Sequence, residues 1–286
     1  MRCVKVQSRD ALRHVASSEL TSLRLQRSLA LMTAPTIPVV LIHGFTGSPA
    51  SWDSVVEGLN GVDLDLATWV SRVGLPGHGG RAAPSSLADS DAAIAAVIDA
   101  PALLVGYSLG GRLALHYALK HPAQVRGLLL FGARPGLPDD SARDARAEAD
   151  RQLAIRLRED GLEAFADRWE TLPLLRPRTA SCAAITKTRA IRRSHDAPGL
   201  ASALEVFSPG RLPDLWPRLG ELIAPATWVA GTEDADYMSM MRRAASHCSR
   251  GDFESVPGAG HDVLTDSPVQ VADLICKYVS RLIATG

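Results

Sequence analysis

Ala102-Leu103-Leu104-Val105-Gly106-Tyr107-Ser108-Leu109-Gly110-Gly111 is the stretch that decides the fold of this 286-residue chain. Its first four residues are all apolar, which is typical of a strand buried on both faces of a parallel sheet. Gly106 and Gly110 stand two residues before and after Ser108, where small residues permit a tight, strained turn from strand to helix. Such a turn lifts the serine hydroxyl above the sheet, so Ser108 is the candidate nucleophile.

Apolar runs and helical patterns alternate on both sides of this turn, which predicts a doubly wound, mostly parallel α/β sheet. Strands are expected at residues 39–42, 68–73, 102–105, 125–131, 227–230 and 253–256. Helices are expected from near Ser51, a residue type that caps helices, and at residues 87–98, 110–119, 237–246 and 268–283. Residues 32–134 and 221–286 should therefore form one α/β core.

Residues 135–220 interrupt this alternation and hold no convincing strand. The segment opens with Pro135-Gly136-Leu137-Pro138 and continues as a charged helix, followed by a second helical patch around Phe165 and Trp169. An insertion at this point of a doubly wound sheet should lie above the carboxyl ends of the strands, where ligands bind. We therefore expect residues 135–220 to form a helical lid.

The net charge of the chain is zero, with 31 basic and 31 acidic side chains, which disfavours a nucleic-acid partner. Four scattered cysteines without metal-ligand spacing indicate structural thiols in a reducing compartment and no metal site. No membrane span is indicated, and the basic leader at residues 1–31 should be poorly ordered or an over-long predicted start. We expect a cytoplasmic monomer or weak oligomer.

A serine hydroxyl needs an imidazole to activate it, and in this fold order the histidine comes last, with a carboxylate between the two. His261 lies in a small-residue turn after a late strand, Gly258-Ala259-Gly260-His261, so it is the candidate base. The orienting acid should follow the fifth predicted strand. Asp234 is favoured there, Asp236 is the second choice, and Glu233 is expected to be solvated.

A reaction that develops negative charge on an oxygen needs two backbone N–H groups aimed at that oxygen. Leu109, directly after the serine, supplies one of them from the start of a helix. Phe45, in the turn His43-Gly44-Phe45 after the first strand, is placed to supply the other. The ring of Phe45 can line the pocket at the same time, because the donor belongs to the main chain.

Arg112 lies in the first turn of the helix after Ser108, where the helix dipole disfavours a cation by about 0.3–1 kcal/mol. A solvated surface arginine is one interpretation. The other is that its guanidinium faces the pocket and binds a substrate carboxylate. Arg143 and Arg146 are one turn apart on the predicted lid helix and could join it. Together, the three arginines predict a small anionic substrate.

The run from Gly106 to Ala114 closely resembles that of the 2-succinyl-6-hydroxy-2,4-cyclohexadiene-1-carboxylate synthase family, which are α/β-hydrolase-fold lyases of menaquinone biosynthesis. The resemblance extends from about residue 38 to the C-terminus and implies an α/β-hydrolase fold with a helical lid. Shorter motifs are similar as well: His43-Gly44-Phe45, Leu75-Pro76-Gly77-His78-Gly79-Gly80, Pro135-Gly136-Leu137, the spacing of Arg143, Arg146 and Asp150, Phe165-Ala166-Asp167, and Leu215-Trp216.

The resemblance implies an elimination, not a hydrolysis. Ser108, polarised by His261, would take a proton from 2-succinyl-5-enolpyruvyl-6-hydroxy-3-cyclohexene-1-carboxylate, and pyruvate would leave without an acyl-enzyme. No metal or organic cofactor is implied. The residues that carry over by position as substrate binders are Arg112, Arg146 and Trp169, with Tyr107 lining the pocket.

Asp236-Tyr237 departs from the family pattern, which commonly has a lysine or similar polar residue followed by phenylalanine. A negative charge here is unfavourable for an anionic substrate unless Asp236 points away or pairs with an arginine. Two other functions compete with the lyase. One is a serine hydrolase acting on an ester, lactone or carbon–carbon bond, with Ser108 as covalent nucleophile. The other is a non-catalytic binding module, which is disfavoured because every triad position is filled.

Overall fold

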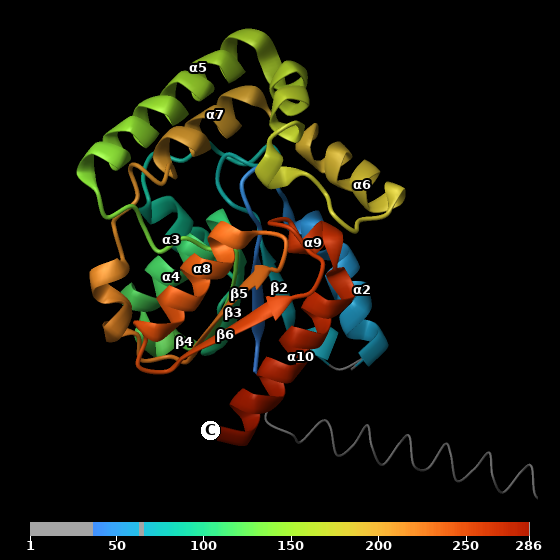
Figure 1. Cartoon of the computed structure of the whole chain (residues 1–286), viewed down its shortest axis with the longest axis vertical. Coiled ribbons are helices and arrows are strands. Elements are labelled where there is room, and N and C mark those ends of the chain that lie inside the picture. Colours follow the sequence, from blue (N-terminus) through green and yellow to red (C-terminus); the bar gives the residue numbers. More distant parts are fainter. Residues whose placement is uncertain (1–36, 63–65, 286) are drawn as a thin grey trace, which may run out of the picture. The chain divides into compact units, whose positions relative to one another are not determined.

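The computed structural model describes residues 37–62 and 66–285 (Figure 1). The expectation for the leader at residues 1–31 lies outside these residues. The strands of the described part are β1 (Val39–Ile42), β2 (Val70–Val73), β3 (Ala102–Tyr107), β4 (Val125–Phe131), β5 (Ala226–Gly231) and β6 (Gly251–Val256). They form one sheet in the order β2-β1-β3-β4-β5-β6, and every neighbouring pair is parallel.

Helices cover both faces of this sheet (Figure 1). They are α2 (Asp53–Val62), α3 (Ala88–Ala95), α4 (Leu109–Lys120), α8 (Ala235–Ser246), α9 (Val263–Asp266) and α10 (Pro268–Thr285), with a short 3-10 helix, η3 (Pro122–Gln124), before β4. Alternate strand residues point to opposite faces. In β3, Leu104 joins the core shared with α3, α4 and α8, whereas Leu103 joins the core shared with α2 and α10. The predicted parallel α/β class is therefore confirmed.

Between β4 and β5 the chain forms a group of helices that we call the helical insertion. It comprises α5 (Asp140–Glu170), α6 (Cys182–Arg192) and α7 (Ala197–Val206), with the short 3-10 helices η4 (Pro173–Leu175) and η5 (Trp216–Glu221). Figure 1 shows α5 and α7 stacked together at one end of the sheet. They share a small core of their own, in which Leu157 and Phe165 pack with Leu200.

Gly161 breaks α5 with a φ of 82°, a left-handed conformation that favours glycine. The charged first part of α5 is thereby separated from a second part that carries Phe165 and Trp169. Two helical patches were expected in this stretch, and the break accounts for the division.

Two predicted boundaries are wrong. A 3-10 helix, η1 (Pro49–Trp52), precedes α2 and is capped by Ser48, because Pro49 is suited to the first helical position. The Ser51 side chain instead accepts a hydrogen bond from the Ser48 amide at 3.1 Å. On the other side of α2, η2 (Leu66–Trp69) occupies the first residues expected for β2, and pairing with β1 starts only at Val70.

Cys182 corrects a further expectation. The cysteines were expected to be structural thiols, but Cys182 is exposed at the start of α6 and does not pack in the core.

Candidate active site

Ser108 lies between β3 and α4 with φ 51° and ψ −110°, a strained backbone conformation for a residue with a side chain. The turn is possible only because its neighbours are glycines. A Cβ on Gly106 would come within 2.5 Å of the Cα of Gly111, and one on Gly110 would come within 2.2 Å of the Ile42 carbonyl oxygen. The sequence therefore fixes this strained turn through close backbone packing.

The Ser108 hydroxyl contacts His261, whose Nε2 lies 3.3 Å from Oγ. The other ring nitrogen, Nδ1, lies 2.9 Å from a carboxylate oxygen of Asp234. Both His261 and Asp234 are buried. Asp234 also caps α8 by accepting a hydrogen bond from the Tyr237 amide at 3.3 Å. The structure thus brings Ser108, His261 and Asp234 together in the order that a nucleophile, a base and an orienting acid require.

The other two carboxylates of the acid loop, Glu233 and Asp236, are both exposed. Neither lies against the imidazole: the Nδ1 partner is Asp234.

Close packing holds the imidazole of His261 in place. A Cβ on Gly132, whose φ is 55°, would lie 2.9 Å from the ring carbon Cε1. The Tyr237 ring lies 4.4 Å from the imidazole, between centroids, and the Tyr107 ring lies 5.7 Å away. The histidine therefore has little freedom to turn away from Ser108.

The predicted oxyanion donors lie on the two backbone segments beside Ser108. Leu109 is the first residue of α4, so its amide has no partner within the helix. Phe45 belongs to the segment 43–47, which we call the oxyanion loop. Neither amide donates to a protein acceptor anywhere in the described residues. Both are therefore available to an oxygen bound beside Ser108.

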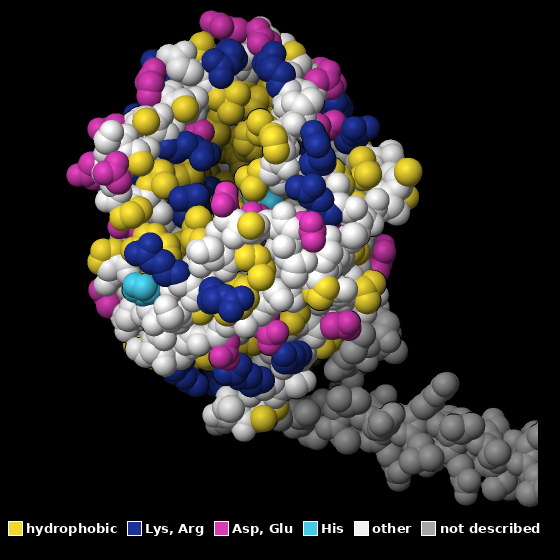
Figure 2. Space-filling view, viewed as in Figure 1, with side chains coloured by type: hydrophobic (Ala, Val, Ile, Leu, Met, Phe, Trp, Pro, Cys, Tyr) yellow, Lys and Arg dark blue, Asp and Glu magenta, His cyan; other side chains and the backbone are white. Residues whose placement is uncertain are grey.

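A cavity of about 290 Å³ opens above Ser108, between the helical insertion and the carboxyl ends of the strands. Figure 2 shows this hollow, with hydrophobic side chains inside it and lysines and arginines along its border. The residues that line it are Phe45, Tyr107, Ser108, Leu109, Arg112, Arg134, Arg146, Trp169, Leu172, Leu174, Leu175, Ala203, Leu204, Phe207, Ser208, Pro209, Asp236, Tyr237 and His261.

Arg112 lines this cavity and is not a solvated surface residue. Burial lowers the pKa of Arg112 to about 10, and the neighbouring cations Arg146 and Arg134 act in the same direction. No carboxylate of the described residues forms an ion pair with its guanidinium, although Asp150 and Tyr237 offset part of the burial. A half-buried cation without a carboxylate partner is costly, so this guanidinium is available to pair with an anion.

Arg146 reaches the cavity from α5 and is held in position by Asp150, whose carboxylate lies 2.8 Å from Nε. Ser208 donates a hydrogen bond to the same carboxylate oxygen at 2.6 Å. Arg143, expected beside Arg146, does not line the cavity: its guanidinium lies 4.0 Å from Asp140. Arg143 is in the first turn of α5, and its backbone packs against Gly210.

Aromatic rings form the wall that the insertion contributes. The Trp169 ring stacks on Phe165 at 5.4 Å and meets the edge of the Phe45 ring at 5.3 Å, between centroids. The indole nitrogen of Trp169 is buried and has no acceptor among the described residues. A bound ligand with an acceptor atom could satisfy it.

Arg134 was missed by the sequence reasoning, although it lines the same cavity. It follows β4 by three residues, so it stands at the carboxyl edge of the sheet, and this position was the available signal. Its guanidinium carbon lies 6.0 Å from the centre of the Tyr237 ring. No ion pair to Arg134 occurs within residues 37–62 and 66–285. Asp236 also lines the cavity, from its exposed side.

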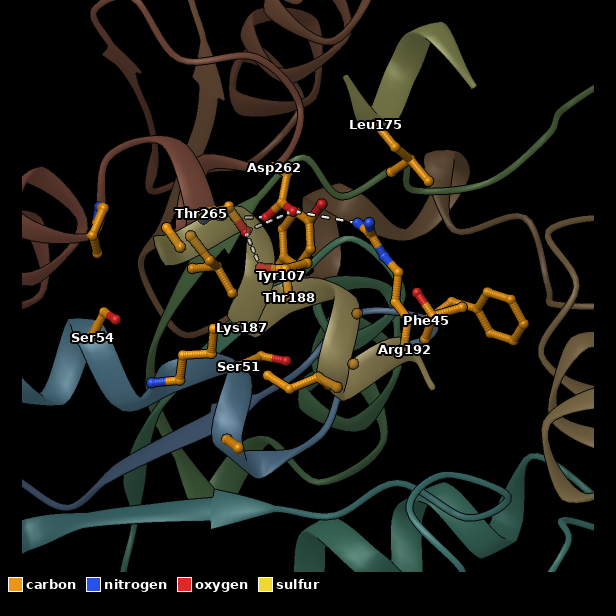
Figure 3. Close-up of a pocket in the computed structure, with 18 residues that line it drawn as sticks. Phe45, Ser51, Ser54, Tyr107, Leu175, Lys187, Thr188, Arg192, Asp262 and Thr265 are labelled. Carbon is orange, nitrogen blue, oxygen red and sulfur yellow. Dashed lines mark hydrogen bonds and ion pairs between the residues drawn. The ribbon is translucent and has the colours of Figure 1, made fainter. Parts of the chain in front are cut away.

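A second, smaller cavity of about 60 Å³ lies beyond Tyr107, which lines both. Figure 3 shows Arg192 extending toward Asp262 there, at 3.7 Å, while Lys187 leaves α6 on the other side. Lys187 pairs with Asp53 of α2 at 3.1 Å. Both cations of this cavity are therefore paired already, unlike Arg112 and Arg134 of the larger one.

Within the described ranges, no cluster of three or more histidine, cysteine, aspartate or glutamate side chains is arranged to hold a metal ion. The same residues include no helix that is both long and apolar enough to cross a membrane.

Comparisons with known proteins agree with this architecture. The model of the alpha/beta hydrolase family matches residues 39–274. The 2-succinyl-6-hydroxy-2,4-cyclohexadiene-1-carboxylate synthase of Enterobacter sp. (strain 638) is 31% identical over 253 residues, covering 84% of this chain and 91% of its own length. The protein of the same name from Klebsiella pneumoniae (strain 342) is 32% identical over 250 residues, covering 85% and 93%.

Among solved structures, MenH from S. aureus superposes with a TM-score of 0.78 at 24% identity, covering 87% of this chain and 96% of that chain. This likeness supports the fold, and the sequence relatives confirm the expected resemblance. The chain therefore belongs to the alpha/beta hydrolase family and, within it, to the family of the 2-succinyl-6-hydroxy-2,4-cyclohexadiene-1-carboxylate synthases.

Proposed function

We propose that this protein is a lyase that eliminates pyruvate from 2-succinyl-5-enolpyruvyl-6-hydroxy-3-cyclohexene-1-carboxylate, a step of menaquinone biosynthesis. The observation that carries the proposal is the set of arginines around the serine. Arg112, Arg134 and Arg146 line one cavity with Ser108, and only Arg146 has a carboxylate partner among the described residues. This substrate carries three carboxylates, so it suits such a site.

The chemistry begins with a proton transfer. The hydrogen on ring carbon C2, next to the succinyl carbonyl, is the acidic one. The Ser108 hydroxyl gives its proton to Nε2 of His261, 3.3 Å away, as the serine oxygen takes the C2 proton. Asp234 stabilises the imidazolium that forms, through its contact with Nδ1.

Charge then develops on the succinyl carbonyl oxygen. The amides of Phe45 and Leu109 are positioned to stabilise it. When the electrons on this oxygen return to the ring, a double bond forms between C2 and C3. The original C3–C4 double bond shifts to C4–C5, and the C5–O bond breaks. The leaving group departs as the enol of pyruvate, and its hydroxyl hydrogen accounts for the proton removed from C2. No covalent bond to Ser108 is needed.

The arginines supply orientation. Arg112 lies half-buried beside the serine, so a carboxylate bound there would also pair with its guanidinium. Arg146 is pre-positioned by Asp150 and Ser208. Asp236 lies at the exposed side of the cavity, where solvent weakens its repulsion of an anionic substrate.

Pyruvate release tests this function directly. The purified protein is mixed with the substrate, and pyruvate is followed with lactate dehydrogenase and NADH. We expect rapid release from the wild type and none from Ser108→Ala. Failure of the wild type to release pyruvate would remove the lyase assignment.

The second candidate is a serine hydrolase, which the contacts among Ser108, His261 and Asp234 favour because the same geometry activates a covalent nucleophile. That enzyme would react with a fluorophosphonate probe and turn over small chromogenic esters rapidly. The lyase should be nearly inert toward such esters.

We propose that the protein is a monomer or weak oligomer. We propose that this form works in the cytoplasm. Sedimentation velocity at micromolar concentration should give a monomer, and a stable larger assembly would contradict this part of the proposal.

A further inference from the structure

Three buried histidines lie behind the oxyanion loop, and the proposed reaction uses none of them. His43 follows β1, His78 lies in the loop after β2, and His195 lies in the helical insertion between α6 and α7. The rings of His43 and His78 are 5.1 Å apart between centroids, and those of His78 and His195 are 5.5 Å apart. None of the three lines the large cavity.

His195 joins two loops of the core through hydrogen bonds to their backbones. Its Nδ1 accepts from the Gly79 amide at 2.8 Å, and its Nε2 donates to the Thr46 carbonyl at 2.9 Å. An amide can only donate and a carbonyl can only accept, so these partners require a neutral ring with its proton on Nε2. The contact with Thr46 spans 149 residues of sequence.

Thr46 is the residue that needs such support. It is buried, and its φ of 62° is in the left-handed region, which is rare for a residue branched at Cβ. A strained conformation of this kind persists only when its surroundings hold it. Thr46 directly follows Phe45, so the conformation of Thr46 helps to set the direction of the Phe45 amide.

The groups around His195 favour its neutral form. Burial lowers the pKa of His195, while Asp196, next in sequence, raises it. The Asp196 carboxylate is engaged in capping α7, where it accepts from the Gly199 amide at 2.7 Å. The other ionisable neighbours, His78 and His43, have their own pKa values lowered by burial, His43 to about 4.

We infer that His195 is a positioning residue, by which the helical insertion holds the oxyanion loop in its strained conformation and keeps the Phe45 amide aimed at the reacting oxygen. This inference rests on the proposed role of Phe45. It gives the insertion a part in the chemical step as well as in substrate binding.

Two substitutions of His195, whose side chains differ by one methylene, test the two hydrogen bonds one at a time. His195→Gln carries its amide near the position of Nε2 and can keep the bond to Thr46. His195→Asn carries its amide near the position of Nδ1 and can keep only the bond from Gly79. Circular dichroism and thermal melting confirm that both variants are folded.

We expect His195→Gln to keep kcat within about 3-fold of wild type, whereas His195→Asn loses about 10- to 100-fold in kcat, as small misplacements of catalytic groups do. KM should change little in either variant, because His195 does not line the cavity. Equal kcat values for the two variants, or a loss confined to KM, would overturn the inference.

A measurement without turnover complements the kinetics. In ¹⁵N-histidine-labelled protein at pH 7, His195 should show a protonated Nε2 and an unprotonated Nδ1. The opposite tautomer overturns the inference. If the wild type releases no pyruvate, the proposed function fails, and the two variants are then compared on a p-nitrophenyl ester, since an oxyanion site serves either reaction.

Discussion

The two walls of the large cavity are built in different ways. On the sheet side, the turn that holds Ser108 contains glycines packed too closely for any other residue. The turn that holds His261 packs in the same way against Gly231 and Gly132. On the insertion side, Arg146 and Trp169 extend from α5, and side-chain contacts hold them: an ion pair to Asp150 and stacking on Phe165. We therefore expect the sheet wall to determine which chemistry is possible, and the insertion wall, together with Arg112, to select the substrate.

This difference explains why the residues of one wall are easier to predict from the sequence than those of the other. A tight backbone turn requires glycines at fixed positions, which are visible in a short stretch of sequence. Side chains that meet across a cavity do so only because of how distant helices pack. Substitutions on the two walls should accordingly have different kinetic consequences.

The largest effect is expected on the sheet wall. Ser108→Ala should lower kcat by at least about 1,000-fold, as removal of a triad member does in related chemistry, with KM nearly unchanged. Steady-state pyruvate release measures this. A loss that appears only in KM would show that the serine binds substrate without reacting.

Substitution of Arg112 should give the next largest loss of activity, and the same substitution should raise the stability of the fold. Arg112→Met should lower kcat/KM about 10- to 100-fold, the value of one or two hydrogen bonds to a charged group. It should also stabilise the fold by on the order of 1–3 kcal/mol, because a half-buried cation with a depressed pKa is removed.

Kinetics and urea unfolding of the same Arg112→Met preparation check both parts. Arg151→Met is the control, since Arg151 pairs with Glu148 on the exposed side of α5. Loss of stability in Arg112→Met would show that the arginine has a structural role instead.

A matched pair on the insertion wall should give a smaller difference. Arg146→Met should raise KM about 10-fold, whereas Arg143→Met, one turn earlier on the same helix, should leave it unchanged. The reason is that Arg146 lines the cavity and Arg143 does not. Equal effects of the two would mean that only the net charge of the insertion matters.

A further effect is expected on stability, not on turnover, at the three buried histidines behind the oxyanion loop. Burial lowers the pKa values of His43, His78 and His195, so the unfolded chain binds more protons than the native one just below pH 6.5. Their contribution is fully present above about pH 6.5 and is lost as the pH falls toward 4. His43 alone accounts for about 3 kcal/mol.

Urea midpoints measured between pH 7.5 and 4.5 test this, with the exposed His247→Gln variant as a control that should follow the wild-type curve. A flat profile would show that these histidines do not remain neutral in the native protein.

The sequence predicted much of the sheet wall because strand patterns and glycine spacing are local. Ser108, His261 and Asp234 meet as their order along the chain implied. The choice of Asp234 over Asp236 is explained by helix capping: Asp234 turns inward at the start of α8, and Asp236 faces outward in its first turn.

Convergence across the fold was harder to predict. Arg134 has no distinctive neighbours in sequence, and Arg143 shares the helical spacing of Arg146 but lies beyond the cavity edge. His195 stood outside every expected catalytic turn, yet it contacts a residue 149 positions away. Such contacts follow from how the insertion folds over the sheet, which no local pattern encodes.

The central claim is that the serine of a hydrolase-like turn acts here as a base and forms no covalent intermediate. Intact-protein mass spectrometry on samples quenched during steady-state turnover tests it, with released pyruvate measured in the same samples. We predict continuous pyruvate release with the protein mass unchanged at every time point. A mass increase that is lost in Ser108→Ala, or turnover without pyruvate, would contradict the account.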